Sequence, residues 1–156
     1  MDKINFISGV ELTPLKKIAH PLGDVFHGIK SSDKGFNGFH EAYFSTIKHG
    51  VIKPWKKHLQ MTLNLIVPVG EIRFVLLDNR ENSSTKDQFM DVSLSIENYY
   101  RLTVPPEIWV GFKGEGNSTN LLLNVANLSH NPSEIVRADL NKFKFKWHVT
   151  IFCFFT

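Results

Sequence analysis

The chain has 156 residues, 42% hydrophobic and 21% charged, and its formal net charge is +3. This is the composition of one globular domain with a sizeable core, and it excludes a disordered or fibrous chain. The small, scattered charge gives no reason to expect a nucleic-acid partner. No segment approaches the roughly 20 apolar residues of a membrane span, so we expect no membrane partner. The start lacks the apolar run of a signal peptide, and the single Cys153 suits a reducing compartment, which together predict a cytoplasmic protein.

Short strands separated by turns are predicted along most of the chain. Glycine and proline punctuate the first forty residues, which leaves room for strands at 16–18 and 24–29 and for a longer one at 38–47. Further strands are expected at 62–69, 71–77, 92–96, 99–104 and 121–126. Strands that recur about every 8–12 residues are typical of an all-β sandwich or barrel.

The C-terminal part is predicted to hold one short helix and a final strand. The helix covers 133–140, where Ser133 after a proline could serve as its N-cap. Residues 142–149 alternate lysine with aromatic residues, which predicts a half-buried strand with a basic outer face. This C-terminal strand continues to residue 156 through an almost wholly apolar run. Such an end must be covered by this subunit or by another, which favours a homodimer.

Five residues resemble the first motif of the cupin superfamily, G-x5-H-x-H-x4-E-x6-G, at every interval. The matching positions are Gly50, Lys56, His58, Leu63 and Gly70. The resemblance implies one cupin-like domain over 1–156 with its motif core at 38–147. The implied fold is all-β, a cupin-type jelly-roll or double-stranded β-helix sandwich with little helix.

The positions that bind metal in cupins hold other chemistry in this chain. Lys56 replaces a His and Leu63 replaces a Glu in the first motif. In the second motif Glu107 stands for a Gly, Val110 for the His and Gly114 for the Asn. Because a tight site needs at least three convergent donors, we predict no metal. A metal cupin with an unusual ligand set remains an alternative.

The strand after Gly50 carries two ionisable side chains on one face. Strand residues alternate, so Lys56 and His58 point one way while Trp55 and Lys57 point the other. In a cupin barrel the first pair would face the interior, with His58 as acid/base and Lys56 as a charge or second proton carrier. The alternative is that both lie in solvent at the barrel mouth.

Three segments together resemble the dTDP-4-dehydrorhamnose 3,5-epimerases of rhamnose biosynthesis. Residues 50–56 resemble their G-V-x-R-G-x-H strand, 70–80 their G-E-x-x-x-V-x-x-D-x-R segment and 104–112 their I-P-x-G-x-x-H-G-F turn. An Asn-Pro-x-Glu at 131–134 resembles a further passage of that family. The position of the family's base falls on Lys56, and no tyrosine follows Tyr100. The resemblance therefore implies a divergent member that lacks the usual His/Tyr catalytic pair.

This resemblance implies a cofactor-independent epimerase or isomerase that acts on a nucleotide-linked 4-keto-6-deoxy sugar. Its place would be cell-surface polysaccharide biosynthesis, such as O-antigen or capsule. We expect His58 and Lys56 to be catalytic. The predicted substrate-binding residues are Lys53, Trp55, Asn64, Asp78, Arg80 and Trp109. The rival hypothesis is a non-catalytic cupin that binds a sugar nucleotide or carbohydrate.

Two groups of these residues also have purely structural interpretations. Asp78 and Arg80 share a strand face and could be a local ion pair at a strand end. Trp55 and Trp109 could stack a nucleobase or could simply fill a core.

Overall fold

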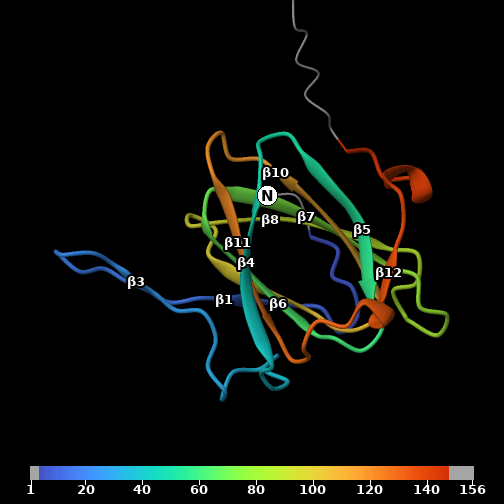
Figure 1. Cartoon of the computed structure of the whole chain (residues 1–156), viewed down its shortest axis with the longest axis horizontal. Helices are drawn as coiled ribbons and strands as arrows, with labels where there is room; N and C mark the ends of the chain where they lie inside the picture. Colours follow the sequence, from blue (N-terminus) through green and yellow to red (C-terminus); the bar gives the residue numbers. More distant parts are fainter. Residues whose placement is uncertain (1–3, 148–156) are drawn as a thin grey trace, which may run out of the picture.

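Two five-stranded antiparallel sheets face each other in the computed structural model, which describes residues 4–147 (Figure 1). The first has the order β1-β9-β6-β11-β4, with bounds Glu11–Pro14, Tyr100–Val104, Leu63–Val69, Asn120–Ala126 and Glu41–Ile47. The second has the order β12-β5-β10-β7-β8, with bounds Ile135–Arg137, Ile52–His58, Ile108–Gly114, Glu71–Asp78 and Phe89–Ser95. This architecture confirms the predicted all-β, cupin-type jelly-roll.

The main core lies between the two sheets and follows the alternation of their strands. Along β7, Ile72, Phe74 and Leu76 point into this core and are fully buried. Val75 and Leu77, on the opposite side of the same strand, belong to a second apolar cluster on the outer face. Both faces of β7 are covered at these positions, which explains the unbroken apolar run over residues 74–77.

Gly70 makes the turn between β6 and β7 and closes the cupin-like motif. Its φ of +77° lies in the left-handed region. A Cβ at this position would collide with the side chain of Asn120 and the carbonyl of Thr119. Only glycine meets both conditions, so the spacing of the motif is set by backbone geometry here.

The helix predicted at 133–140 is wrong. The chain forms a single 3-10 turn, η1 (Pro132–Glu134), and then enters β12, which pairs with the edge of β5. The cap is Asn131, whose side chain accepts from the backbone N–H of Ser133. The β-branched residues that follow favour the free sheet edge over a helix. Within 4–147, no helix is long and apolar enough to cross a membrane.

The strand predicted at 142–149 is also wrong where the structure describes it. The 3-10 turn η2 (Leu140–Lys142) leads into a segment without strand pairing. The rings of Phe145 and Trp147 pack against each other, and all three aromatic residues of this segment, Phe143 included, pack against the outer face of the second sheet. The alternation therefore marks one-sided burial by side chains rather than membership of a sheet. The rest of the predicted strand, to residue 156, lies outside the described residues.

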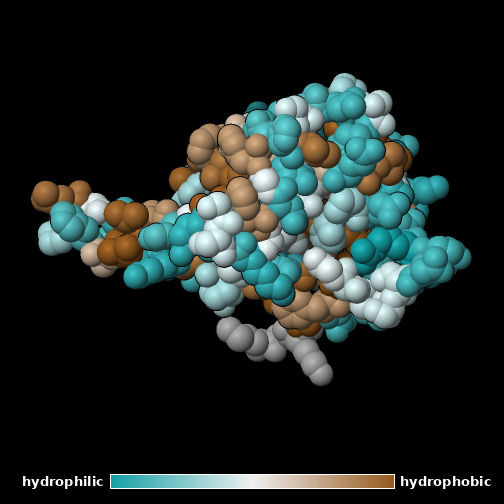
Figure 2. All heavy atoms as spheres, turned by 90° about the horizontal axis from the view of Figure 1, so that it is seen from below, coloured by the Kyte–Doolittle hydropathy of each residue, from teal (hydrophilic) through white to brown (hydrophobic). Residues whose placement is uncertain are grey.

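A two-stranded arm projects from the sandwich at the left of Figure 1. It consists of β2 (Lys17–Ile18) and β3 (Val25–Phe26), at two of the predicted early strands. Figure 2 shows hydrophobic side chains along this arm. Leu22, in the turn that joins the two strands, is 92% exposed.

Candidate active site

A cavity of about 170 Å³ lies between the sheets, where β4 and β11 face β5 and β10. Its apolar wall consists of Leu63, Leu65, Val110, Phe112 and Leu122. Its polar wall includes Tyr43, Ser45, Lys53, Lys56, His58 and Asn124. Leu63 and Val110 occupy positions where the cupin motifs carry metal ligands, and here their side chains form part of the apolar wall. Among the described residues, no three His, Cys, Asp or Glu side chains converge as a metal site requires.

His58, at the end of β5, is held by a buried carboxylate. Its Nδ1 is hydrogen-bonded to Oε1 of Glu134, and the two side chains are only 11% and 7% exposed. Because Nδ1–H donates to this carboxylate, Nε2 carries the free lone pair and can take up a proton. A histidine oriented in this way by a carboxylate has the geometry of a general base.

Backbone amides that follow β5 hold Glu134 in its ionised form. Its Oε2 accepts from the N–H groups of Leu59, Gln60 and Met61 at 3.1, 3.1 and 3.3 Å. Burial by itself would raise the pKa of Glu134, but the bonds from His58 and from the amides of Gln60 and Met61 lower it below its usual range. The ionised carboxylate keeps the proton of the imidazole on Nδ1.

Lys56 lines the same cavity within a group of positive charges. Lys53 also lines the cavity, and both lysines border an adjoining groove of about 430 Å³ together with Arg137. Partial desolvation lowers the pKa of Lys56, and the charges of Arg137 and Lys53 lower it further. An anionic ligand would reduce the electrostatic repulsion among these positive charges.

Tyr43 and Asn124 form the opposite polar wall, on the first sheet. They are paired across β4 and β11, and Nδ2 of Asn124 donates to the Tyr43 hydroxyl at 3.1 Å. Asn124 is 2% exposed, and its Oδ1 has no hydrogen-bond partner. The second sheet therefore contributes the ionisable side chains of His58 and Lys56 to the cavity, and the first sheet contributes the hydrogen-bonding side chains of Tyr43 and Asn124.

Trp55 and Trp109 do not place their rings in the cavity. Both are buried in the apolar cluster on the outer face of the second sheet, beneath Phe143 and Trp147. Trp55 Nε1 donates to the carbonyl of Leu140 at 3.2 Å. The core-filling interpretation describes their position, because strand alternation turns them away from His58.

Asn64 also lies outside the cavity. It is on the outer face of the first sheet, where it is 1% exposed. Its amide donates to the carbonyl of Gly35 at 3.3 Å, and it accepts from the Thr103 hydroxyl at 2.7 Å. These contacts attach a surface loop to the sheet and leave Asn64 no access to a ligand in the cavity.

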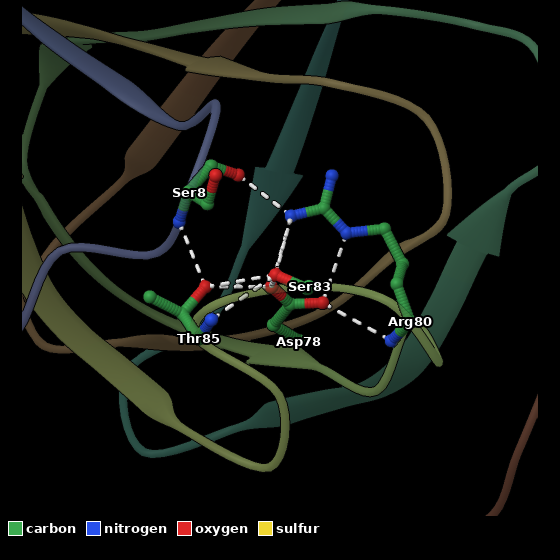
Figure 3. A network of polar contacts seen from close by, with 5 residues as sticks. All are labelled: Ser8, Asp78, Arg80, Ser83 and Thr85. Carbon is green, nitrogen blue, oxygen red and sulfur yellow. Dashed lines mark hydrogen bonds and ion pairs between the residues drawn. The ribbon is translucent and has the colours of Figure 1, made fainter.

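Asp78 and Arg80 form the predicted local pair, within a larger network (Figure 3). Arg80 Nε and Nη2 both donate to the Asp78 carboxylate at 2.9 Å, and Ser83 and Thr85 donate to it as well. Arg80 Nη2 also reaches the Ser8 carbonyl at 2.7 Å. Neither member of the pair lines the cavity. The network attaches the N-terminal segment and the loop after β7 to the sandwich through hydrogen bonds.

Sequence reasoning missed Glu134, Tyr43 and Asn124. The Asn-Pro-x-Glu segment is visible in the sequence, but the contact with His58 joins residues 76 apart through the β12–β5 pairing. The alternation around Tyr43 is two-sided, so it does not reveal which face turns inward. These residues could be recognised only once the sheet pairing was known.

The structure thus combines a carboxylate-held histidine and a lysine in a cupin jelly-roll, an arrangement of side chains that enzymes of the proton-transfer class use. The sequence profile of the dTDP-4-dehydrorhamnose 3,5-epimerase family matches residues 25–153, and the chain belongs to this family. Its members are sugar-nucleotide epimerases, which confirms the resemblance found in the sequence.

The similar proteins agree with this assignment. The crystal structure of a dTDP sugar isomerase from Desulfovibrio desulfuricans G20 is 35% identical, with a TM-score of 0.87 over 90% of this chain and 92% of that one. A probable low-salt glycan biosynthesis epimerase of Haloferax volcanii is 30% identical over 53% of this chain and 54% of its own length. A spore coat polysaccharide biosynthesis protein of Bacillus subtilis, SpsL, is 25% identical over 82% of this chain and 85% of that protein. The match to the Haloferax protein thus spans about half of its length.

Proposed function

We propose that this protein epimerises or isomerises a nucleotide-linked 4-keto-6-deoxy sugar for cell-surface polysaccharide synthesis, such as O-antigen or capsule. The observation that carries the proposal is the His58–Glu134 pair beside Lys56 in the cavity. The names of the similar proteins support both the nucleotide-sugar substrate and the polysaccharide product.

In the proposed reaction, His58 Nε2 removes a proton from a carbon next to the ketone. The electron pair of the C–H bond moves to the carbonyl oxygen, and Lys56 stabilises the resulting enolate. Glu134 stabilises the imidazolium that forms and keeps the ring oriented. Return of a proton to carbon completes the isomerisation, with no net change in atoms or electrons. No metal or organic cofactor takes part in this sequence.

The size of the cavity suggests how the substrate would be divided. Its volume of about 170 Å³ is below the roughly 300–1,000 Å³ of sites that enclose whole drug-sized ligands. The sugar ring would occupy the cavity. The diphosphate would lie in the adjoining groove near Lys53 and Arg137, where the clustered cations favour an anion.

A homodimer and a cytoplasmic location remain part of this proposal. Besides the apolar sequence at the C-terminus, the projecting arm exposes four apolar side chains, Ile18, Leu22, Val25 and Phe26. An isolated two-stranded hairpin is marginally stable in water, so contact with a second copy would stabilise it. The single cysteine suits a reducing compartment.

The test is deuterium incorporation from D₂O into a dTDP-4-keto-6-deoxy sugar, followed by mass spectrometry. The wild type should exchange a carbon-bound proton, and His58→Asn should abolish this exchange. Lys57→Met is the matched control, because Lys57 lies on the same strand but packs over the Trp109 ring on the outer face. Tight binding of the sugar nucleotide with no exchange by the wild type would favour the non-catalytic binding protein.

A further inference from the structure

The side-chain amide of Asn124 is fully buried, and only one of its two polar atoms is hydrogen-bonded. Its Nδ2 donates to Tyr43, while its Oδ1, in a side chain that lines the cavity, has no partner in the structure. Buried polar atoms are almost always hydrogen-bonded, and an unpaired one is costly to stability. An unpaired acceptor in the wall of a cavity is therefore best explained by a ligand that brings a donor.

The Tyr43 hydroxyl has the complementary capacity. One of its lone pairs accepts from Nδ2 of Asn124, which leaves its own O–H proton available to donate. The two residues are direct cross-strand partners on β4 and β11, so the free acceptor and the free donor are held side by side. The two groups together match a ligand hydroxyl, which donates one hydrogen bond and accepts another.

We infer that Tyr43 and Asn124 form a hydroxyl-binding subsite that selects a sugar ring by one of its hydroxyl groups. The inference rests on the proposed function for the identity of the ligand as a sugar. A ligand hydroxyl donates to Oδ1 of Asn124 and accepts from the Tyr43 O–H. His58 and Lys56 approach the ring from the other sheet, so the subsite fixes which carbon of the ring faces the base.

This arrangement also makes the subsite selective. A site built to bond a hydroxyl rejects an analogue without it, because the buried acceptor then stays unpaired. Leu65 and Leu122 also line this part of the cavity, and no side chain that the structure describes offers Oδ1 of Asn124 a hydrogen bond. Discrimination against one deoxy sugar is therefore the expected signature, rather than a uniform gain in affinity.

The experiment measures binding rather than turnover, so that it is independent of the proposed chemistry. Calorimetry would compare dTDP-6-deoxyglucose with three analogues that each lack one of the remaining ring hydroxyls. We expect the wild type to bind one analogue about 10- to 100-fold more weakly than the parent, the range that an unpaired buried acceptor implies. Asn124→Leu should weaken the binding of the parent, dTDP-6-deoxyglucose, by the same factor. The affinity for that one analogue should stay unchanged. Tyr43→Phe, which keeps the ring, should give a smaller loss of the same pattern.

Ser45→Ala is the control, because this residue offers another hydroxyl on the cavity wall of β4. It should preserve the discrimination. Equal weakening of all four sugars by Asn124→Leu, or loss of discrimination in Ser45→Ala instead, would overturn the subsite. Failure of the wild type to bind any of them would overturn both the subsite and the sugar-nucleotide assignment. Binding with the expected pattern but no deuterium exchange would overturn only the proposed enzymatic activity.

Discussion

Two buried carboxylates, Glu134 and Asp78, have similar surroundings and different consequences. Their side chains are 7% and 0% exposed, and each accepts several hydrogen bonds. In both, burial by itself would raise the pKa, and the hydrogen bonds lower it below the usual range. The difference is the partner, which is the imidazole of His58 in one case and the guanidinium of Arg80 in the other.

A guanidinium stays protonated under all physiological conditions, whereas an imidazole exchanges its proton near neutral pH. The Asp78–Arg80 pair is therefore a fixed charge pair, and its further bonds go to the N-terminal segment and the following loop. The Glu134–His58 pair can change its protonation state, and its histidine opens onto the cavity. Burial and satisfied hydrogen bonds are thus common to both pairs, and the chemistry of the partner separates the proposed catalytic pair from the structural one.

The largest expected effect is on catalysis in Glu134→Gln. The amide NH₂ of Gln cannot face the three backbone N–H groups that now bond Oε2, so it turns toward His58. Nδ1 must then accept, the proton moves to Nε2, and the base is lost. We expect the deuterium exchange rate to fall about 10²- to 10⁴-fold. A rate within a few-fold of wild type would show that the carboxylate does not orient the histidine.

The second largest effect is on stability in Asp78→Asn. The Asn amide removes the negative charge and keeps only one acceptor oxygen, so it can bond either Arg80 or the Ser83 and Thr85 hydroxyls but not all three. Because Arg80 is itself 24% exposed, we expect a loss of about 2–3 kcal/mol in the free energy of unfolding, below the full cost of a completely buried pair. Urea denaturation would measure it, and the exchange rate per folded molecule should stay near wild type.

Asp91→Asn is the matched control for this change. Asp91 also pairs with an arginine, Arg73, but it is 41% exposed. A surface pair of this kind is worth about 0–1 kcal/mol. Equal losses in the two variants would contradict the structural role assigned to Asp78.

The third prediction concerns the loss of stability at acidic pH. The pKa values of Glu134 and Asp78 lie below their ordinary values of 4.5 and 3.8. As pH falls, the unfolded chain therefore binds these protons before the folded chain does, and stability declines. Their contributions should be complete above about pH 6 and should be lost progressively as the pH falls through these ordinary values toward the folded ones.

Urea denaturation at a series of pH values would check this dependence. Asp78→Asn should flatten the decline at the acid end of the series, and Glu134→Gln should flatten the part that begins at higher pH. A wild-type stability that does not change between neutral pH and about pH 3 would contradict both assignments.

Much of the fold could be predicted from the sequence because strand alternation and turn residues are local properties. Gly70 and the apolar runs on either side of it place β6 and β7 within a residue of where the structure has them. The two errors at the C-terminus share one cause. A short segment takes whatever conformation its tertiary partner offers, which is a sheet edge for β12 and an aromatic surface for residues 143–147.

The candidate site was less predictable because it combines side chains from five strands and a turn. Alternation within β5 puts Lys56 and His58 on one face, the cupin resemblance implied that this face is inward, and the structure shows both on the cavity wall. Trp55 and Asn64 were also predicted to bind substrate, but their side chains lie on the outer faces of the two sheets. Glu134 required a pairing between distant segments.

The smallest predicted effect lies at Glu107, which connects the two regions. Its backbone N–H donates to the His58 carbonyl at 2.7 Å, while its side chain lines an outer groove with Arg80. Its φ of +67° is unfavourable for any residue with a Cβ. Glu107→Gly should therefore raise the free energy of unfolding by about 0.5–1 kcal/mol, because relief of the strain outweighs the extra freedom of the unfolded chain.

Glu107→Ala keeps the Cβ and should bring no such gain, which separates backbone strain from loss of the carboxylate. Paired urea denaturation curves would compare the two variants, and equal effects would refute the strain argument. Exchange activity should be unchanged in both, because the contact with His58 uses the backbone N–H that every residue except proline retains. A gain in stability with full activity would show that this turn can be relaxed without disturbing the histidine, so that the orientation of the base depends on Glu134.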